Sequence, residues 1–280
     1  MKQIILIVSI LTISYFTSAQ SQVETGTRQS GIGGSGLVLT DIWSSYHNQA
    51  GLADLSGLTT GLFYSNLFGV DAFRQSAFAI AVPTEKYGSA GINYTYSGDS
   101  YSNFSKFGFA YAKRLGKRFT AGIQMDYFRL AQITYGVSGV AVGEIGLIAE
   151  PVENLFIAAH VFNPWRSKYS GTGETMTSIL RIGAGYKFSE KVLFTLEGEK
   201  DIEKDAVVKA GTEYNVAEGL FLRAGVSTNP TKYSFGLGYN YKGVVLDVAY
   251  INHNTIGYYM QFGLGYTINK KGEEKIEEKL

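Results

Sequence analysis

The sequence predicts an all-β fold: a transmembrane antiparallel up-and-down β-barrel of about fourteen strands, with a short N-terminal segment inserted into it as a plug. Three observations lead to this prediction. The chain starts with a secretory pattern, alternates apolar and polar residues from about residue 59, and separates its strands by short and longer connections in turn. Its composition agrees, because 34 Gly, 20 Tyr and 17 Phe accompany only 4 Pro and no Cys.

Residues 1–19 form a predicted signal peptide. Lys2 precedes the apolar run 4–16, and the small residues of 17–19 follow it, which is the order typical of a cleaved secretory signal. The run is about 13 residues long, shorter than the ~20 that a helix needs to cross a bilayer. No run of about 18 apolar residues follows Gln20, so an exported chain of this kind is either soluble or a barrel.

Strand periodicity favours the barrel. One face of residues 119–127 carries Phe, Ala, Ile, Met and Tyr, while the other carries Thr, Gly, Gln and Asp. Residues 258–266 and 233–239 repeat the pattern, again with Gly and Ser opposite the large side chains. A soluble sandwich would place Val, Ile and Leu on its inner face and charges on its outer face. Aromatic residues opposite small ones instead indicate a lipid-facing outer wall and a crowded interior.

The alternating segments delimit fourteen strands, with one region before the barrel and one after it. Residues 20–58 lack the alternation and form a predicted plug-like segment, residues 59–268 form the barrel, and residues 269–280 form a charged periplasmic tail. An even strand count places both ends of the barrel in the periplasm. The predicted strands lie near residues 59–68, 75–83, 87–97, 103–113, 118–128, 139–150, 154–162, 177–188, 191–200, 205–214, 219–227, 231–240, 243–251 and 258–268.

Charged residues on the inward phase of these strands are the candidate functional residues. A Lys or Arg facing lipid near the membrane midplane would cost about 2–4 kcal/mol, so these side chains should point into the lumen. There they form either a bracing network or a polar surface for a solute or peptide. The residues are Lys106, Asp126, Glu144, His160, Arg181, Lys187, Glu197, Glu199, Lys209, Glu213, Arg223 and Asp247.

Two pairings are expected inside the lumen. Lys209 should contact Glu197 or Glu213, because all three occupy inward positions of one strand or its neighbour. An inserted plug should lie near Arg181 and Arg223, with Asp41 or Asp54 of the plug available to pair with them.

The sequence gives no indication of an enzyme, a cofactor or a metal site. Gly31, Gly33 and Gly36 match G-x-G-x-x-G, but a dinucleotide site needs this motif inside a strand-helix-strand unit. The three histidines show no metal-ligand spacing, and no nucleophile motif occurs. A net charge of +1 indicates no nucleic-acid partner. The lack of Cys excludes thiol chemistry.

The plug-like segment carries a family resemblance. Residues 33–39 read Gly-Gly-Ser-Gly-Leu-Val-Leu, Asp41 follows, and the element Tyr46-His47-Asn48-Gln49-Ala50-Gly51-Leu52-Ala53 precedes the barrel. This resembles the FadL-type outer-membrane family, whose members carry G-G-A-x-x-A and N-P-A-G-L-A before fourteen strands. It is most similar to the PorV and PorQ barrels associated with type IX secretion. The chain departs from that pattern at Gln49, where the family usually has Pro.

The resemblance implies location in the bacterial outer membrane and two functions. One is an accessory barrel of a secretion or assembly machine that contacts lipid and a larger outer-membrane protein or secreted cargo, and the short loops and charged lumen favour it. The alternative is a FadL-like channel for small hydrophobic molecules, with residues 20–58 as the plug. A purely structural barrel is a third possibility.

Overall fold

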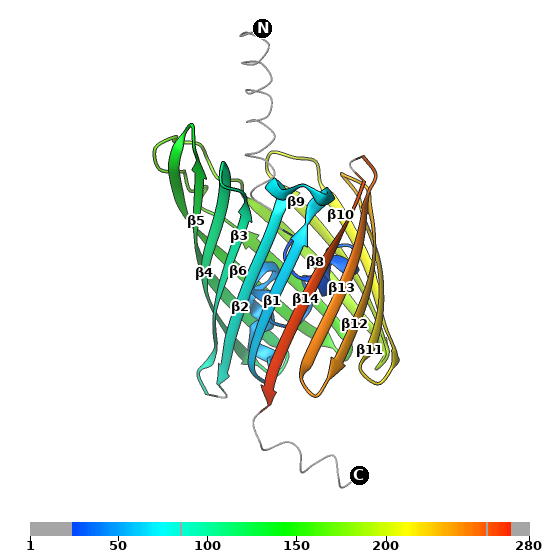
Figure 1. Cartoon of the computed structure of the whole chain (residues 1–280). Coiled ribbons are helices and arrows are strands. Elements are labelled where there is room, and N and C mark those ends of the chain that lie inside the picture. The colour runs from blue at the N-terminus through cyan, green and yellow to red at the C-terminus, as the bar shows by residue number, and fades with distance from the viewer. Residues whose placement is uncertain (1–23, 85, 256, 270–280) are drawn as a thin grey trace.

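Fourteen antiparallel strands close into one barrel (Figure 1). The computed structural model describes residues 24–84, 86–255 and 257–269. Each strand pairs with the next along the chain, and β1 pairs with β14 to close the sheet. Closure leaves no sheet edge exposed, which a sheet needs inside a bilayer because lipid offers no hydrogen bonds to unpaired backbone groups. The expected signal peptide and nearly all of the charged tail lie outside the described residues.

The predicted number of strands is confirmed. Each end differs from its predicted position by at most four residues, with the largest difference where β5 continues to Gln132. Alternation there stops at Phe128, but backbone pairing with β4 and β6 continues. The strands are β1 Gly57–Asn66, β2 Arg74–Thr84, β3 Gly88–Gly98, β4 Ser102–Gly116, β5 Phe119–Gln132, β6 Gly136–Val152, β7 Leu155–Phe162, β8 Ile179–Ser189, β9 Val192–Asp201, β10 Val207–Ala217, β11 Leu220–Ser227, β12 Lys232–Tyr241, β13 Val244–His253 and β14 Gly257–Asn269.

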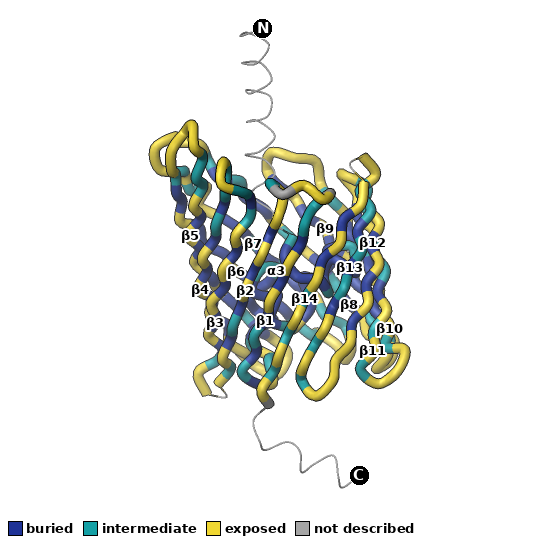
Figure 2. The backbone as a smooth tube through the Cα atoms, viewed as in Figure 1, coloured by how far each residue is buried: buried dark blue, intermediate teal, exposed yellow. Residues whose placement is uncertain are grey.

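The strands have one apolar exposed face and one buried face, as the sequence predicts. Figure 2 shows exposed and buried positions alternating along each strand. In β14, Phe262 is 47% exposed while its neighbour Gln261 is 1% exposed. The outward face carries aromatic and aliphatic side chains around the barrel, which is the surface that hydrocarbon requires. Among the described residues, no helix is long and apolar enough to span a membrane.

The two ends of the barrel differ in their connections. At one end, the two-residue turns 117–118, 153–154, 190–191, 218–219 and 242–243 join neighbouring strands. We call this the short-turn end. The opposite, long-loop end carries longer connections, of which 163–178 is the longest. Outer-membrane barrels have short periplasmic turns and longer external loops, so the prediction from the sequence assigns the short-turn end to the periplasm. β1 begins and β14 ends there (Figure 1).

Residues 24–56 lie inside the barrel, and we call them the plug (Figure 1). The plug contains the short helices α2 (Thr27–Gly31) and α3 (Ser44–His47) and the 3-10 helix η1 (Gln49–Asp54). The helix α2 packs against β11–β14, and η1 packs against β2–β6 across the lumen. Two further 3-10 helices, η2 (Leu67–Gly69) and η3 (Asp71–Phe73), lie in the connection between β1 and β2.

An apolar cluster anchors the plug on the side of η1. Ile42, Trp43 and Leu52 of the plug are buried against Phe63 of β1 and small residues of β2 and β4. The rings of Trp43 and Phe63 meet edge to face, with centroids 5.9 Å apart. Such packing contributes through burial of apolar area and through the ring geometry. The plug is therefore a packed part of the interior.

We expect Phe262→Arg to lower the free energy of unfolding in lipid by about 2–4 kcal/mol, because Phe262 faces outward in the middle of β14. Ile268 faces the same way but lies near the short-turn end of the strand, so Ile268→Arg should cost only ~0–1 kcal/mol. Urea titration of the protein in lipid vesicles measures both. Equal losses would contradict the assignment of this face to the hydrocarbon.

Candidate functional site

The inward charges predicted from the sequence lie inside the barrel in three clusters. Ten of the twelve candidates are buried, and Arg181 is partly buried. Lys187, on the same phase, is instead exposed near the short-turn end, with its Nζ 5.2 Å from the ring centroid of Phe156. In the part of the chain that the structure describes, no group of His, Asp or Glu side chains could hold a metal ion.

The first cluster joins four neighbouring strands, β4 to β7. Lys106 Nζ lies 3.4 Å from Asp126 Oδ1 and 3.8 Å from Glu144 Oε1. His160 Nε2 lies 2.9 Å from Glu144 Oε2. The plug enters the cluster through Gln49, whose Nε2 donates to the same Glu144 oxygen at 2.6 Å. Adjacent strands thus bring side chains together that are far apart in the sequence.

The plug motif at residues 48–52 is fully enclosed. Asn48 Oδ1 accepts a hydrogen bond from Ala50 N and so caps η1, while its Nδ2 donates to the carbonyls of Leu37 and Leu147. Gln49, at the position where the resemblance implies Pro, supplies the donor for Glu144. Sequence reasoning marked the motif, but it could not identify the carboxylate that Gln49 contacts.

The second cluster lies on β8, β9 and β10. Glu199 Oε2 accepts from Arg181 Nε at 2.8 Å and from Lys209 Nζ at 2.8 Å. Lys209 Nζ also lies 3.3 Å from Glu197 Oε1, and the other oxygen of Glu197 accepts from Leu37 N of the plug. The structure therefore places Lys209 against Glu197, one of its two predicted partners, and against Glu199.

The third cluster ties the plug to β10, β11 and β13. Arg223 donates to Glu213 and to Asp247, each at 2.6 Å. Arg28 of the plug donates to both oxygens of Glu213, at 2.7 and 2.8 Å, and lies 3.1 Å from Asp41 Oδ2. Burial acts to lower the pKa of Arg28, but the charges of Glu213 and Asp41 outweigh it and raise that pKa. Arg28 therefore stays charged in the lumen.

The predicted pairing of the plug acids was wrong. Asp41 pairs with Arg28 of the plug itself, and Asp54 pairs with Arg114 of β4, so neither contacts Arg181 or Arg223. The physical reason is that carboxylates of neighbouring strands already hold both of these arginines. Sequence reasoning missed Arg28 because it lies outside the alternating strands that revealed the other inward charges.

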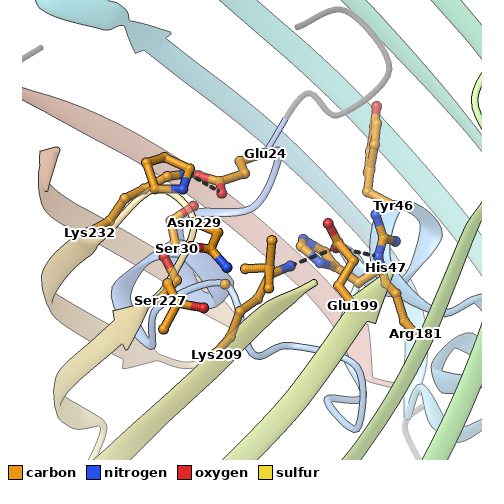
Figure 3. A pocket seen from close by; sticks show the side chains of 14 residues that line it. Glu24, Ser30, Tyr46, His47, Arg181, Glu199, Lys209, Ser227, Asn229 and Lys232 are labelled. Atoms are coloured by element: carbon orange, nitrogen blue, oxygen red, sulfur yellow. Dashed lines mark hydrogen bonds and ion pairs between the residues drawn. The ribbon is translucent and has the colours of Figure 1, made fainter. Parts of the chain in front are cut away.

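Two cavities flank the helix α2. The long-loop cavity, of about 80 Å³, is lined by Ser30 and Gly34 of the plug and by polar groups of β8–β12. Figure 3 shows Lys209 and Arg181 both directed at Glu199 in this cavity. The short-turn cavity, of about 290 Å³, is lined by Arg28 and Asp41 of the plug and by β1 and β10–β14. Residues of α2 thus line both cavities.

His47 is a partly buried titratable group of the plug beside the long-loop cavity (Figure 3). Burial is the main cause that lowers the pKa of His47 to about 4, and the positive charges of Arg181 and Lys209 lower it further. The contact of its Nε2 with the carbonyl oxygen of Thr25, at 2.7 Å, acts in the opposite direction. The imidazole is therefore neutral at pH 7 and donates this hydrogen bond.

Comparison with known proteins identifies the fold. No family model and no curated protein matches the sequence. The structure is similar to that of the toluene transporter TodX of Pseudomonas putida, with 13% identity, a TM-score of 0.63, and coverage of 86% of this chain and 97% of that one. A TodX variant described as a monoaromatic hydrocarbon channel matches with 13% identity and a TM-score of 0.63, covering 90% and 99% of the two chains.

A FadL homologue of Pseudomonas aeruginosa matches as well, with 11% identity, a TM-score of 0.59, and coverage of 88% of this chain and 99% of that one. At such low identities the likeness establishes the fold. The chain has the fourteen-strand barrel fold of TodX and of the FadL homologue. The finer assignment to the PorV and PorQ barrels stays a prediction.

Lys209 should be energetically coupled to Glu199 and not to Glu213. A double-mutant cycle with Lys209→Met and Glu199→Gln should give a coupling energy above about 0.5 kcal/mol, because each change removes one charged partner of the other buried group. The same cycle with Glu213→Gln should fall below ~0.5 kcal/mol, because Arg28 and Arg223 hold Glu213. Urea unfolding of the four variants of each cycle measures the couplings. Equal coupling in both cycles would contradict the contacts.

The plug should loosen as the pH falls. The pKa of His47 is about 4 in the folded state, below the ~6.5 of an unfolded histidine. Its contribution to stability is therefore full above pH ~6.5 and is lost as the pH falls toward 4. His47→Gln, which keeps a donor but does not titrate, should remove this part of the pH dependence. Protection factors of plug amides at pH 7 and at pH 4.5 measure it, and an unchanged dependence in the variant would assign it to another group.

Proposed function

We propose that this protein is a plugged outer-membrane channel for small molecules that have an apolar body. The fold shared with TodX and with a FadL homologue supports the proposal, because those relatives include a toluene transporter and a monoaromatic hydrocarbon channel. The observation that carries it lies in the lumen, where one short plug helix, α2, separates a cavity at the long-loop end from a larger cavity at the short-turn end.

The barrier between the cavities is small. The helix α2 has five residues, and polar contacts are among those that hold it to the wall. Gly33, just beyond α2, donates to Ser234 Oγ, and Arg28 contacts Glu213. A local shift of α2 would connect the cavities without disturbing the strand pairing of the barrel. Loops and short segments move on timescales of nanoseconds to milliseconds, which is compatible with passage of a solute.

The wall chemistry supports a solute with an apolar body. The short-turn cavity has an apolar part, which is lined by Ile42, Trp43, Leu55, Phe221 and Val245. Pockets that bind small ligands usually combine such apolar walls with a few polar groups that orient the ligand.

The comparisons favour the channel over the accessory role in secretion that the sequence resemblance suggests. The relatives named above are described as a transporter, a channel and a FadL homologue, and none is described as a component of a secretion machine. In the proposed channel, the plug is therefore the gate.

A disulfide that fixes the plug should stop passage reversibly. Ser35 of the plug and Thr195 of β9 are both buried, and their hydroxyl oxygens are 2.7 Å apart. The side chains are thus close enough for Ser35→Cys and Thr195→Cys to form a bond, and the native chain has no Cys to compete. Liposomes containing the oxidised double variant should take up labelled toluene no faster than empty liposomes. Reductant should restore the uptake of the wild-type protein.

The Ser35→Cys single variant controls for the substitution and for the oxidant. It should transport at the wild-type rate in both redox conditions. Uptake that equals that of empty liposomes for every variant, wild type included, would overturn the channel proposal. Uptake that persists in the oxidised double variant would show that solutes pass without movement of the plug.

A further inference from the structure

The short-turn cavity has the size and the mixed lining of a ligand site. Its volume of about 290 Å³ lies just below the roughly 300–1,000 Å³ range of small-molecule pockets. Exposed residues at its rim, among them Thr40, Ser56 and Asn240, open it toward the short-turn end. A molecule of about the size of a substituted benzene can therefore enter from that side.

One part of the lining is apolar and aromatic. Trp43 and Ile42 of the plug belong to the buried apolar cluster beside β1, and Trp43 is 4% exposed. Phe221 of β11 lines the wall contributed by the barrel, with the guanidinium of Arg223 5.6 Å from its ring centroid. These side chains favour an apolar or aromatic body, and aromatic rings also attract cations.

The other part of the lining has more hydrogen-bond acceptors than donors. Four carboxylates line it, those of Asp41, Asp54, Glu213 and Asp247, against the two guanidinium groups of Arg28 and Arg223. The donors of Arg28 are already directed at Glu213 and Asp41. An ionised carboxylate has about four acceptor positions and no donor, so the cavity as a whole offers a ligand acceptors.

Two carboxylate oxygens remain for a ligand. Asp247 is only 6% exposed and accepts through Oδ1 from Arg223, while Asp54 accepts through Oδ1 from Arg114. Among the hydrogen bonds of the described residues, none reaches Oδ2 of either aspartate, and neither oxygen is among the enclosed polar atoms of these residues, so both are open to water. A ligand that fills the cavity displaces this water, and a carboxylate oxygen then left without a donor is costly. A bound cation with N–H groups would satisfy it.

We propose that the short-turn cavity binds a small amphipathic cation, with its ammonium group beside Asp247 and its apolar body against Trp43 and Phe221. An anionic ligand would face the acceptor-rich wall, and a plain hydrocarbon would cover the carboxylates without supplying donors. Such a site would define the class of solute that the proposed channel carries, and its physiological role rests on that proposed function. Binding itself can be measured without transport.

The test uses the fluorescence of Trp43 in the full-length protein in detergent. The chain has two Trp residues, and Trp165 lies in the 163–178 connection at the other end of the barrel, so Trp165→Phe leaves Trp43 as the only tryptophan. The probe is 2-phenylethylammonium, compared with neutral toluene and anionic 3-phenylpropionate. We expect a saturable change in Trp43 emission with the cation, at an affinity at least tenfold higher than with either comparison compound.

Two variants locate the site. Asp247→Asn keeps an oxygen for Arg223 but removes the charge, and it should weaken binding of the cation at least tenfold. Asp205→Asn, on the exposed connection between β9 and β10, is the matched control and should bind as the wild type does. Gly265→Leu should block the cavity, because a Cβ at Gly265 meets its nearest neighbours at 3.5 and 3.7 Å and so fits without displacing them.

The outcomes separate this inference from the channel proposal. Equal affinity for the three compounds, or cation binding that Asp247→Asn and Gly265→Leu both leave unchanged, would overturn the inference. Toluene uptake that the plug disulfide blocks, without any saturable binding of the cation, would overturn the inference and leave the channel standing. Cation binding at the predicted affinity, in a protein that transports nothing, would support the site and overturn the channel.

Discussion

The close approach of the plug backbone to the inner wall is the constraint on which the rest of the structure depends. A Cβ added at Gly225 would lie 2.1 Å from Gly33 N, and one added at Gly211 would lie 2.3 Å from the carbonyl oxygen of Ile32. Distances this short leave no room for any side chain, and protein interiors do not tolerate such overlap without movement of the backbone. The small residues opposite the aromatic face of the strands therefore leave the space that residues 24–56 occupy.

Charge on the inner wall follows from the same architecture. Lipid excludes Lys, Arg, Asp and Glu from the outer face, so the strands carry them inward, where the plug removes much of the water. Each buried charge then needs a partner of opposite charge, and the nearest such partners lie on adjoining strands. Glu199 of β9, for example, pairs with Arg181 of β8 and with Lys209 of β10. The plug completes these clusters through Arg28 and Gln49, so its position is fixed by directional polar contacts as well as by apolar packing.

The sequence predicted the barrel well because its signal is local. Alternation along a single strand reports which face meets lipid, and it correctly placed Phe262 outward and Gln261 inward. It also predicted which charged side chains point into the lumen, because the cost of a charge in hydrocarbon sets their direction whatever their partners are. The partners themselves depend on strand register and on the path of the plug, which no local pattern encodes. Asp41 shows this, because its partner Arg28 lies thirteen positions away within the plug and carries no periodic signal.

The contrast between the two sides of the barrel wall bears on how a solute could cross. The outward face is apolar over the height of the strands, whereas the cavities on either side of α2 are lined by paired charges beside a patch of aromatic and aliphatic side chains. A solute inside the barrel would leave water and contact carboxylates and guanidinium groups that already pair with one another. The wall would therefore attract it little, except where a carboxylate oxygen has no donor from the protein. In the proposed channel, selectivity would then depend on those few remaining acceptors, and access would depend on α2, whose ion pair to Glu213 is one of the contacts that would have to break. A polar plug in an apolar membrane barrel thus separates two tasks: the strands provide stability in lipid, and in the proposed channel the plug would control passage through the lumen.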